Sequence, residues 1–142
     1  MENDINRFLK AQEDHYENAL SELKSGRKTS HWMWFIFPQF KGLGFSETSK
    51  FYSIKSLKEA EEYLNHPILG ARLREITEVL IDLDENDAYK IFGRPDNNKL
   101  NSCMTLFSKV DESNEKLFDK VIAKFFNGKS DEATKKLLEK EN

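Results

Sequence analysis

The sequence predicts an all-α fold, a single compact domain of about six to eight helices. Apolar residues recur at intervals of three or four through most of the chain, and residues typical of helix starts and stops bracket these segments. No segment alternates apolar and polar residues around a hairpin turn. A chain of 142 residues can bury a core without disulfides, so residues 1–142 are expected to form one domain.

The N-terminal half contains three predicted helices. The first begins after Asn3 or Asp4, either of which can cap it, and stops at Gly26. The second follows the capping-box pattern of residues 56–59 (SLKE) and ends near Asn65. Pro67 suits the first turn of the third. The inward faces of the first and third hold Ile5, Phe8, Leu9, Gln12, Tyr16, Leu20 and Leu23, and Ile68, Leu69, Leu73, Ile76, Leu80 and Leu83.

The C-terminal half continues the helical pattern. Asp87 is expected to cap a short turn ending at Gly93, and Asp96 to cap the next helix. A further helix stops at Gly128, and residues 131–142 form a charged helix that is expected to fray. The apolar positions of these helices are Leu100, Cys103, Met104, Phe107, Leu117, Val121, Ile122, Phe125, Leu137 and Leu138.

The aromatic segment HWMWFIFPQF (31–40) has two interpretations, a core segment with polar ends or the wall of a pocket. Thr29 or Ser30 can cap a turn that begins at His31. Residues 32–37 are the strongest strand candidate, but they lack a partner strand and indicate a short helix or an extended buried segment. The following GLG (42–44) suits either a plain turn or a loop that approaches a ligand closely. Ser46 then offers a helix start, which is a favourable position for an anion.

Composition excludes several functional classes. A net charge of −3, with 22 basic and 25 acidic residues, gives no basic field for general nucleic-acid binding. The single Cys103 and the scattered His15, His31 and His66 do not form a metal-site pattern, and no metal or cofactor is expected. No apolar run is long enough for a membrane span, and the N-terminus is charged. We therefore expect a soluble, cytoplasmic protein without membrane contact, and the sequence leaves homo-oligomerisation open.

Several polar residues raise the possibility of a site. Asp96, Lys99 and Ser102 lie close to one face of their helix, with Thr105 further round, although a solvated face is the ordinary interpretation of such a set. Gln12 and Arg72 stand among apolar neighbours and need hydrogen-bond partners. Both could face a shared cavity.

Four segments carry a family resemblance: RFLKAQ (7–12), GRKTSHWMWFIFPQFKGLGFS (26–46), YLNHPILGARLRE (63–75) and IFGRPDNNKLNSCMTLF (91–107). Over about residues 5–138 the chain resembles the domain of unknown function 1810 family of small bacterial proteins. The resemblance implies an all-helical single domain but no reaction. The family pattern often has Ser at the position of Cys103, which makes this thiol a poor candidate for an essential nucleophile, whereas Ser102 matches the pattern.

The matching segments include polar residues that packing alone does not require, and we expect several of them to converge on one cleft. In the first hypothesis the cleft binds, or binds and hydrolyses, a small anionic ligand of nucleotide or ADP-ribose type. His31 and Asp96 are its catalytic candidates. Its ligand-binding candidates are Gln12, Trp32, Trp34, Gln39, Arg72, Lys99, Ser102 and Thr105. In the second hypothesis segment 31–40 is exposed and forms a protein–protein interaction module.

Overall fold

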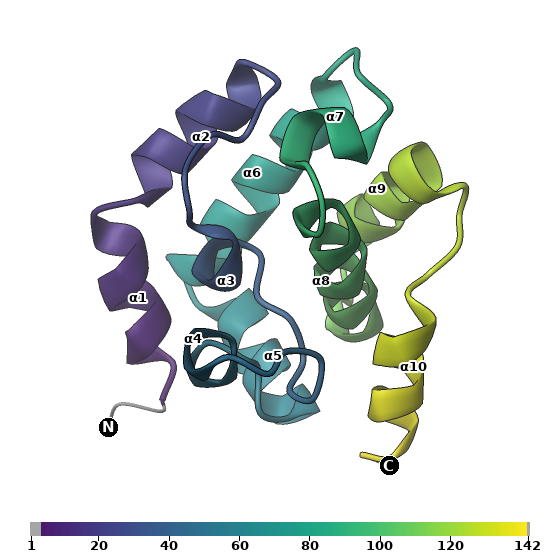
Figure 1. Cartoon of the computed structure of the whole chain (residues 1–142). Coiled ribbons are helices and arrows are strands. Elements are labelled where there is room, and N and C mark those ends of the chain that lie inside the picture. The colour runs from purple at the N-terminus through teal and green to yellow at the C-terminus, as the bar shows by residue number, and fades with distance from the viewer. Residues whose placement is uncertain (1–3, 142) are drawn as a thin grey trace.

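The protein is described by a computed structural model that covers residues 4–141, and this part of the chain is helical (Figure 1). The all-α class is confirmed, but ten helices exceed the predicted six to eight. Three of the ten are single turns of four or five residues. The helices are α1 (Asn6–Glu13), α2 (Tyr16–Lys24), α3 (Met33–Ile36), α4 (Glu47–Phe51), α5 (Leu57–Asn65), α6 (Leu69–Asp82), α7 (Ala88–Phe92), α8 (Asp96–Val110), α9 (Leu117–Phe126) and α10 (Glu132–Glu139).

The first predicted helix is wrong in one respect, because it is broken at residues 14–15 into α1 and α2. The break lets the two halves bury their apolar faces against different partners, since α1 packs on α3 and α2 packs on α6. His15 lies at the break, with its ring 5.3 Å from the ring of Phe35. Asp4 Oδ1 accepts the Asn6 N–H at 2.9 Å, although the N-cap position is Ile5. Asn3 lies outside the described residues.

Two of the predicted helix caps are confirmed, and Ser46, proposed only as a helix start, also serves as a cap. Ser46, Ser56 and Asp87 each accept a backbone N–H of the first turn of α4, α5 and α7. The predicted cap of α8 by Asp96 is wrong, because Asp96 is the first residue of the helix and Pro95 at the N-cap makes no side-chain bond. A carboxylate inside the first turn is free to pair with cations instead.

One further helix start differs from expectation. The helix predicted from Pro67 begins at Leu69, and His66 Nδ1 accepts the N–H groups of Ile68 and Leu69 at 3.1 and 3.2 Å. The last helix, expected to fray, packs against α8. Its Leu138 side chain is buried in the core.

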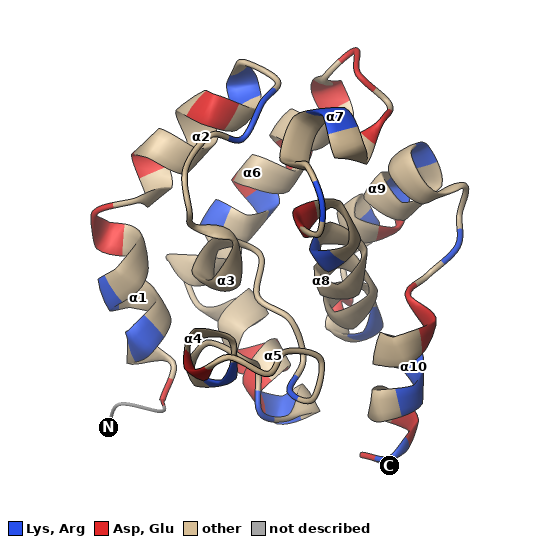
Figure 2. Ribbon diagram, viewed as in Figure 1, with Lys and Arg blue, Asp and Glu red and all other residues tan. Residues whose placement is uncertain are grey.

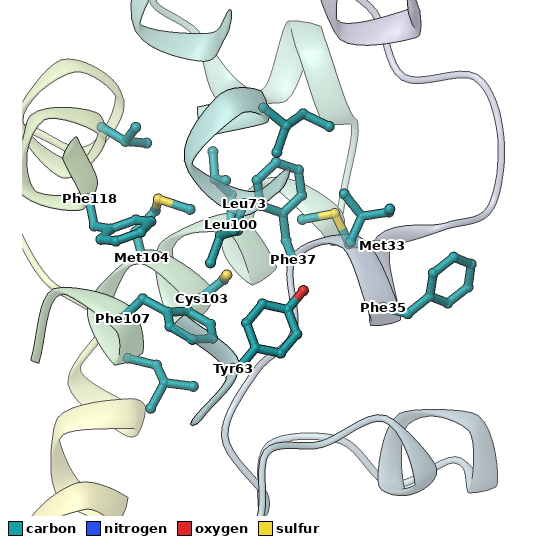
Figure 3. Close-up of a cluster of buried hydrophobic side chains, with 14 of the residues drawn as sticks. Met33, Phe35, Phe37, Tyr63, Leu73, Leu100, Cys103, Met104, Phe107 and Phe118 are labelled. Carbon is teal, nitrogen blue, oxygen red and sulfur yellow. The ribbon is translucent and has the colours of Figure 1, made fainter. Parts of the chain in front are cut away.

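The core surrounds α8, which packs against α5, α7, α9 and α10. Figure 1 shows α8 between the α1–α2 side of the molecule and the α9–α10 side. Figure 3 shows Met33 and Phe37 facing side chains of α8 across the core. Tyr63 of α5 and Phe107 of α8 form one of its ring pairs, with centroids 5.3 Å apart. Burial of these large rings is the main source of stability.

Segment 31–40 is mostly core. Residues 33–36 form the short helix α3, and Trp32, Met33, Phe35, Ile36, Phe37, Pro38 and Phe40 are buried. The burial excludes the exposed aromatic surface that the second hypothesis required. Trp34 and Gln39 alone among the non-terminal residues of the segment are partly exposed. A ligand could therefore reach this segment at Trp34 and Gln39.

The expected cap of this segment by Thr29 or Ser30 is wrong, because Trp32 holds the N-cap position and makes no side-chain bond there. The N–H groups of Thr29 and Ser30 instead donate to Glu22 Oε1 at 2.7 and 3.0 Å.

Charged residues of both signs occur on most of the helices, as Figure 2 shows. Within residues 4–141, no helix is sufficiently long and apolar to cross a bilayer. In the same range, no three His, Cys, Asp or Glu side chains converge as a metal site requires.

Candidate functional site

A groove with two lobes lies beside Trp34. Five residues line both lobes: Trp34, Gln39, Gly44, Phe45 and Ser49. The cationic lobe, of about 450 Å³, is completed by Phe40, Lys41, Gly42, Lys50, Tyr52, Ser53 and Lys55. The polar lobe, of about 470 Å³, is completed by Leu43, Ser46, Pro95, Asn98, Lys99, Ser102, Asp131 and Ala133. Volumes of this size are typical of small-molecule sites.

Backbone hydrogen bonds hold the floor of the groove. Gln39 O accepts the Ile54 N–H at 2.8 Å, and Ile54 O accepts the Lys41 N–H at 2.9 Å. These bonds place Phe40 beside Ile54 in an isolated parallel bridge. The backbone is thus joined at residues 39–41 and at Ile54. The intervening residues 41–53, which include α4, form a closed loop around the cationic lobe.

Two glycines give the loop its path. Gly42 has a φ of +97°, a conformation that favours glycine, and a Cβ there would lie 3.2 Å from the Leu137 side chain. A Cβ at Gly44 would lie 2.4 Å from Ser49 Oγ. The GLG motif therefore serves close packing of the loop, at the point where both lobes meet.

Arg7 clamps the outer wall of the cationic lobe and was missed in the sequence. Its guanidinium donates to Phe51 O and Ser53 O, both at 2.7 Å, and to both carboxylate oxygens of Glu59, at 2.9 and 3.0 Å. Glu59 Oε1 also accepts the Lys55 N–H at 2.8 Å. One feature of the sequence could have identified Arg7 as a buried, paired residue: it is an arginine on the inward face of the first helix, next to Phe8.

Three lysines that the sequence did not single out give the cationic lobe its charge: Lys41, Lys50 and Lys55. Lys55 Nζ donates to Lys50 O and to Ser53 Oγ. Burial, followed by the charge of Arg7, lowers the pKa of Lys55, while Glu59 opposes this shift. No Asp or Glu lines the lobe. The lobe is therefore a local concentration of positive charge in a protein of net charge −3.

Four of the predicted site residues meet at the polar lobe: Trp34, Gln39, Lys99 and Ser102. Lys99 Nζ lies 5.2 Å from the centre of the Trp34 ring, a cation–π distance. Ser102 Oγ donates to Asn98 O at 3.3 Å, one turn earlier in α8. Trp34 and Gln39 also line the cationic lobe.

Asp96 stands behind this wall and orients lysines. Its Oδ1 lies 3.4 Å from Lys99 Nζ, and its Oδ2 lies 2.9 Å from Lys28 Nζ. Lys28 Nζ also donates to Ser30 O at 2.6 Å and lies 5.0 Å from the centre of the Trp32 ring. Asp96 is therefore one contact removed from the groove.

Two further predicted residues lie outside the groove. His31 is exposed and lines neither lobe. Trp32 is fully buried, and its indole N–H donates to Glu22 Oε1 at 3.0 Å. Burial raises the pKa of Glu22, but the hydrogen bonds from Ser30, Thr29 and Trp32 outweigh this and lower it to about 2. Trp32 thus serves the packing of α2 against the aromatic segment.

Gln12 and Arg72 find their hydrogen-bond partners inside the fold. Gln12 Nε2 donates to Phe35 O at 2.8 Å and to the Tyr63 hydroxyl at 2.9 Å, and Gln12 Oε1 accepts from Arg72 at 3.4 Å. The Arg72 guanidinium lies 5.1 Å from the centre of the Tyr16 ring. Neither residue lines the groove.

Thr105 joins α8 to the start of α10. Its Oγ1 accepts the Asp131 N–H at 2.9 Å and lies 3.2 Å from Asn101 Oδ1. It lines a separate hollow of about 400 Å³ with Ser108, Lys109, Ser130, Lys135, Leu138 and Glu139.

The groove therefore contains four of the ten residues predicted for the site. A fifth, Asp96, does not line the groove but contacts Lys99, which does.

The groove is equipped for binding more than for covalent chemistry. Its lining residues include no His or Cys, and the Asp131 carboxylate accepts the N–H and hydroxyl of Thr134 as the cap of α10. Ser46 and Ser49 hydrogen-bond to each other. Burial raises the pKa of the Cys103 thiol well above its usual value, so this group is not a thiolate nucleophile.

Comparison with known proteins agrees with the fold. The crystal structure of the conserved hypothetical protein Rv1873 from Mycobacterium tuberculosis superposes with a TM-score of 0.92, at 43% sequence identity, over 96% of this chain and 97% of that one. Comparison with curated proteins gives no match. The model of the family described as "Protein of unknown function (DUF1810)" matches residues 2–138. The chain therefore belongs to the DUF1810 family.

Proposed function

We propose that the groove binds a small anionic ligand that carries a planar ring, of nucleotide or ADP-ribose type. The observation that supports this most is the cationic lobe, where Lys41, Lys50 and Lys55 line one hollow without a carboxylate. Such a concentration of charge attracts phosphate or carboxylate groups. Trp34 lines the same hollow and offers a partly exposed indole.

Phe45 adds an apolar contact. This residue is 88% exposed and lines both lobes. Covering a phenylalanine completely stabilises a complex by roughly 1.5–3 kcal/mol, and a ring stacked on it adds about 0.5–1.5 kcal/mol. A ligand ring between Phe45 and Trp34 would gain from both contacts.

Hydrolysis has less support than binding. Of the two catalytic candidates, His31 lies outside the groove and Asp96 is held by two lysine ammonium groups. Asp96 also lines neither lobe of the groove. The proposal therefore concerns binding and assigns no reaction.

The alternative function, a protein–protein interaction module, would use a surface other than segment 31–40. Segment 31–40 is too buried for it, but the exposure of Phe45 favours a contact centred on the loop of residues 42–46. A protein partner would cover Phe45 without requiring the lysines below it. The two functions are thus separated by the dependence of binding on Lys41, Lys50 and Lys55.

A ligand screen tests the proposal. Thermal unfolding is measured with nucleotides, NAD, ADP-ribose and small carboxylates, and each stabilising compound is titrated calorimetrically into wild type, Lys50→Met and Lys136→Met. Lys136 is an exposed lysine of α10 outside the groove and serves as the matched control. We expect Lys50→Met to lose tenfold or more in affinity, because a charge-assisted contact contributes roughly 1.5–3 kcal/mol. No stabilisation by any compound would favour the interaction module.

A further inference from the structure

We infer that the groove takes a two-part ligand, with a phosphate group in the cationic lobe and a neutral hydrogen-bonding part in the polar lobe, joined across Gly44. This inference rests on the proposed function and specifies its ligand class. The ligand would be a phosphorylated nucleoside or a compound of the same two-part chemistry.

The two lobes differ in charge. The cationic lobe has three lysines and no acidic residue, which gives a formal side-chain charge of +3. The polar lobe has one lysine, Lys99, and one aspartate, Asp131, which gives a formal charge of zero. Because an excess of positive charge attracts an anion, a phosphate is expected in the cationic lobe.

The pairing of the lysines strengthens this difference. Lys99 already has a carboxylate partner, with its Nζ 3.4 Å from Asp96 Oδ1. Lys55 Nζ is bound to neutral oxygens, and within residues 4–141 no carboxylate lies within ion-pair distance of Lys50. Lys41 has a long contact, at 3.7 Å, with Glu141. Lys50 and Lys55 therefore have charge available for a ligand, and Lys99 has little.

The polar lobe offers neutral partners instead. Gln39, Ser46, Asn98 and Ser102 present amide and hydroxyl groups along it. Such groups both donate and accept hydrogen bonds, which suits the hydroxyls of a sugar and the edge of a base. Ser102 Oγ donates to Asn98 O and keeps acceptor capacity for a ligand hydroxyl.

A ligand that occupies both lobes would have to pass through the region that the two lobes share. Trp34 and Phe45 line both lobes, and Gly44 lies between them without a side chain. A Cβ at residue 44 would lie 2.4 Å from Ser49 Oγ, so any larger residue would displace Ser49 at the crossing. A ring held at Trp34 and Phe45 thus has a phosphate site on one side and neutral partners on the other.

The experiment separates the parts of the ligand. Backbone amide signals of ¹⁵N-labelled protein are followed during titration with inorganic pyrophosphate, with adenosine and with ADP. We expect pyrophosphate to shift residues 49–55, adenosine to shift residues 98–102, and ADP to shift both sets with an affinity at least tenfold above that of either fragment. Lys50→Met should weaken pyrophosphate and ADP tenfold or more while leaving the adenosine shifts unchanged. Lys99→Met should leave pyrophosphate binding within threefold of wild type.

The possible failures are distinct. If ADP shifts groove signals but its affinity is unaffected by Lys50→Met and Lys55→Met, both the two-part assignment and the role of the cationic lobe in the proposed function are overturned. The two-part assignment is also overturned, with binding intact, if pyrophosphate shifts residues 98–102 instead of 49–55. If none of the three probes shifts a groove signal at millimolar concentration, the two-part assignment is overturned. In that case the proposed function depends on the wider ligand screen.

Discussion

The Lys99 ammonium group lies 5.2 Å from the centre of the Trp34 ring, and the Asp96 carboxylate behind it also pairs with Lys28. Lys28 in turn lies 5.0 Å from the Trp32 ring. Two lysine–tryptophan pairs therefore share one carboxylate, one pair in the core and the other at the groove. Through these two ion pairs, Asp96 connects the buried Trp32 region of the aromatic segment with the Trp34 wall of the groove.

Replacing Asp96 tests this link. The Lys28 side chain is only 7% exposed, and Asp96→Asn would remove the carboxylate charge that pairs with its ammonium group, leaving only neutral acceptors such as Ser30 O. We expect a loss of roughly 1.5–3 kcal/mol in the free energy of unfolding, measured by urea denaturation. Glu132→Gln, which removes an exposed ion pair with Lys135, is the control and should change little. Equal stability of the two variants would show that Asp96 does not hold Lys28.

The clamp made by Arg7 should be among the most sensitive points of the fold. Arg7→Met removes the buried partner of Glu59 and leaves Phe51 O and Ser53 O without their donor. The expected loss is roughly 3–5 kcal/mol, typical of breaking a buried ion pair. Lys10→Met, at an exposed position of the same helix, should stay within about 0.5 kcal/mol of wild type. A double variant, Arg7→Met with Glu59→Leu, should lose less than the two single losses added together. Additive losses would contradict the clamp.

Glu22 should make stability depend on pH. Its pKa is lowered from 4.5 to about 2 in the fold, so its contribution is fully present above pH 4.5 and is lost as the pH falls towards 2. Glu22→Gln should therefore be less stable than wild type at neutral pH, and the difference should shrink between pH 4.5 and 2. The measurement is urea denaturation of both proteins across this range. A difference that stays constant with pH would show that the Glu22 charge is not what stabilises the fold.

Gly70 should not tolerate a side chain. A Cβ at this position of α6 would lie 1.9 Å from Leu64 O, a backbone atom at the end of α5. Gly70→Ala should cost roughly 1–3 kcal/mol or more, since the two helices must separate. The neighbouring Ala71→Gly, at an exposed position, should cost about 1 kcal/mol through helix propensity alone. Thermal unfolding compares the two, and a stabilised Gly70→Ala would contradict the close α5–α6 contact.

The sequence predicted features that depend on neighbouring residues. Ser56 and Asp87 cap their helices because each side chain reaches an N–H two or three residues later, and such contacts are visible in the sequence. The fold class followed from the spacing of apolar residues. Trp34, Gln39, Lys99 and Ser102 were identified because they are polar or large residues in segments that carry the family pattern.

Features that depend on distant parts of the chain were missed or misassigned. Lys41 and Lys55 meet because Gln39 and Ile54 are joined by backbone hydrogen bonds, which no local pattern signals. Asp96 was interpreted as a cap because its partner Lys28 lies far away in the sequence. Gln12 and Arg72 need hydrogen-bond partners, as expected, but these lie within the fold: Gln12 bonds to Phe35 O and the Tyr63 hydroxyl, and Arg72 donates to Gln12.

The most direct test of the binding groove uses the two tryptophan indole signals. Trp34 lines the groove, whereas Trp32 is buried and bound to Glu22, so one chain contains both the probe and its control. The indole N–H signals, assigned with Trp34→Phe, are followed while the nucleotide and ADP-ribose panel is titrated into ¹⁵N-labelled protein. We expect a saturable shift of the Trp34 signal, weakened tenfold or more by Lys50→Met, with the Trp32 signal unmoved. A Trp34 signal that does not respond to any compound of the panel would contradict the groove as a site for anionic ligands.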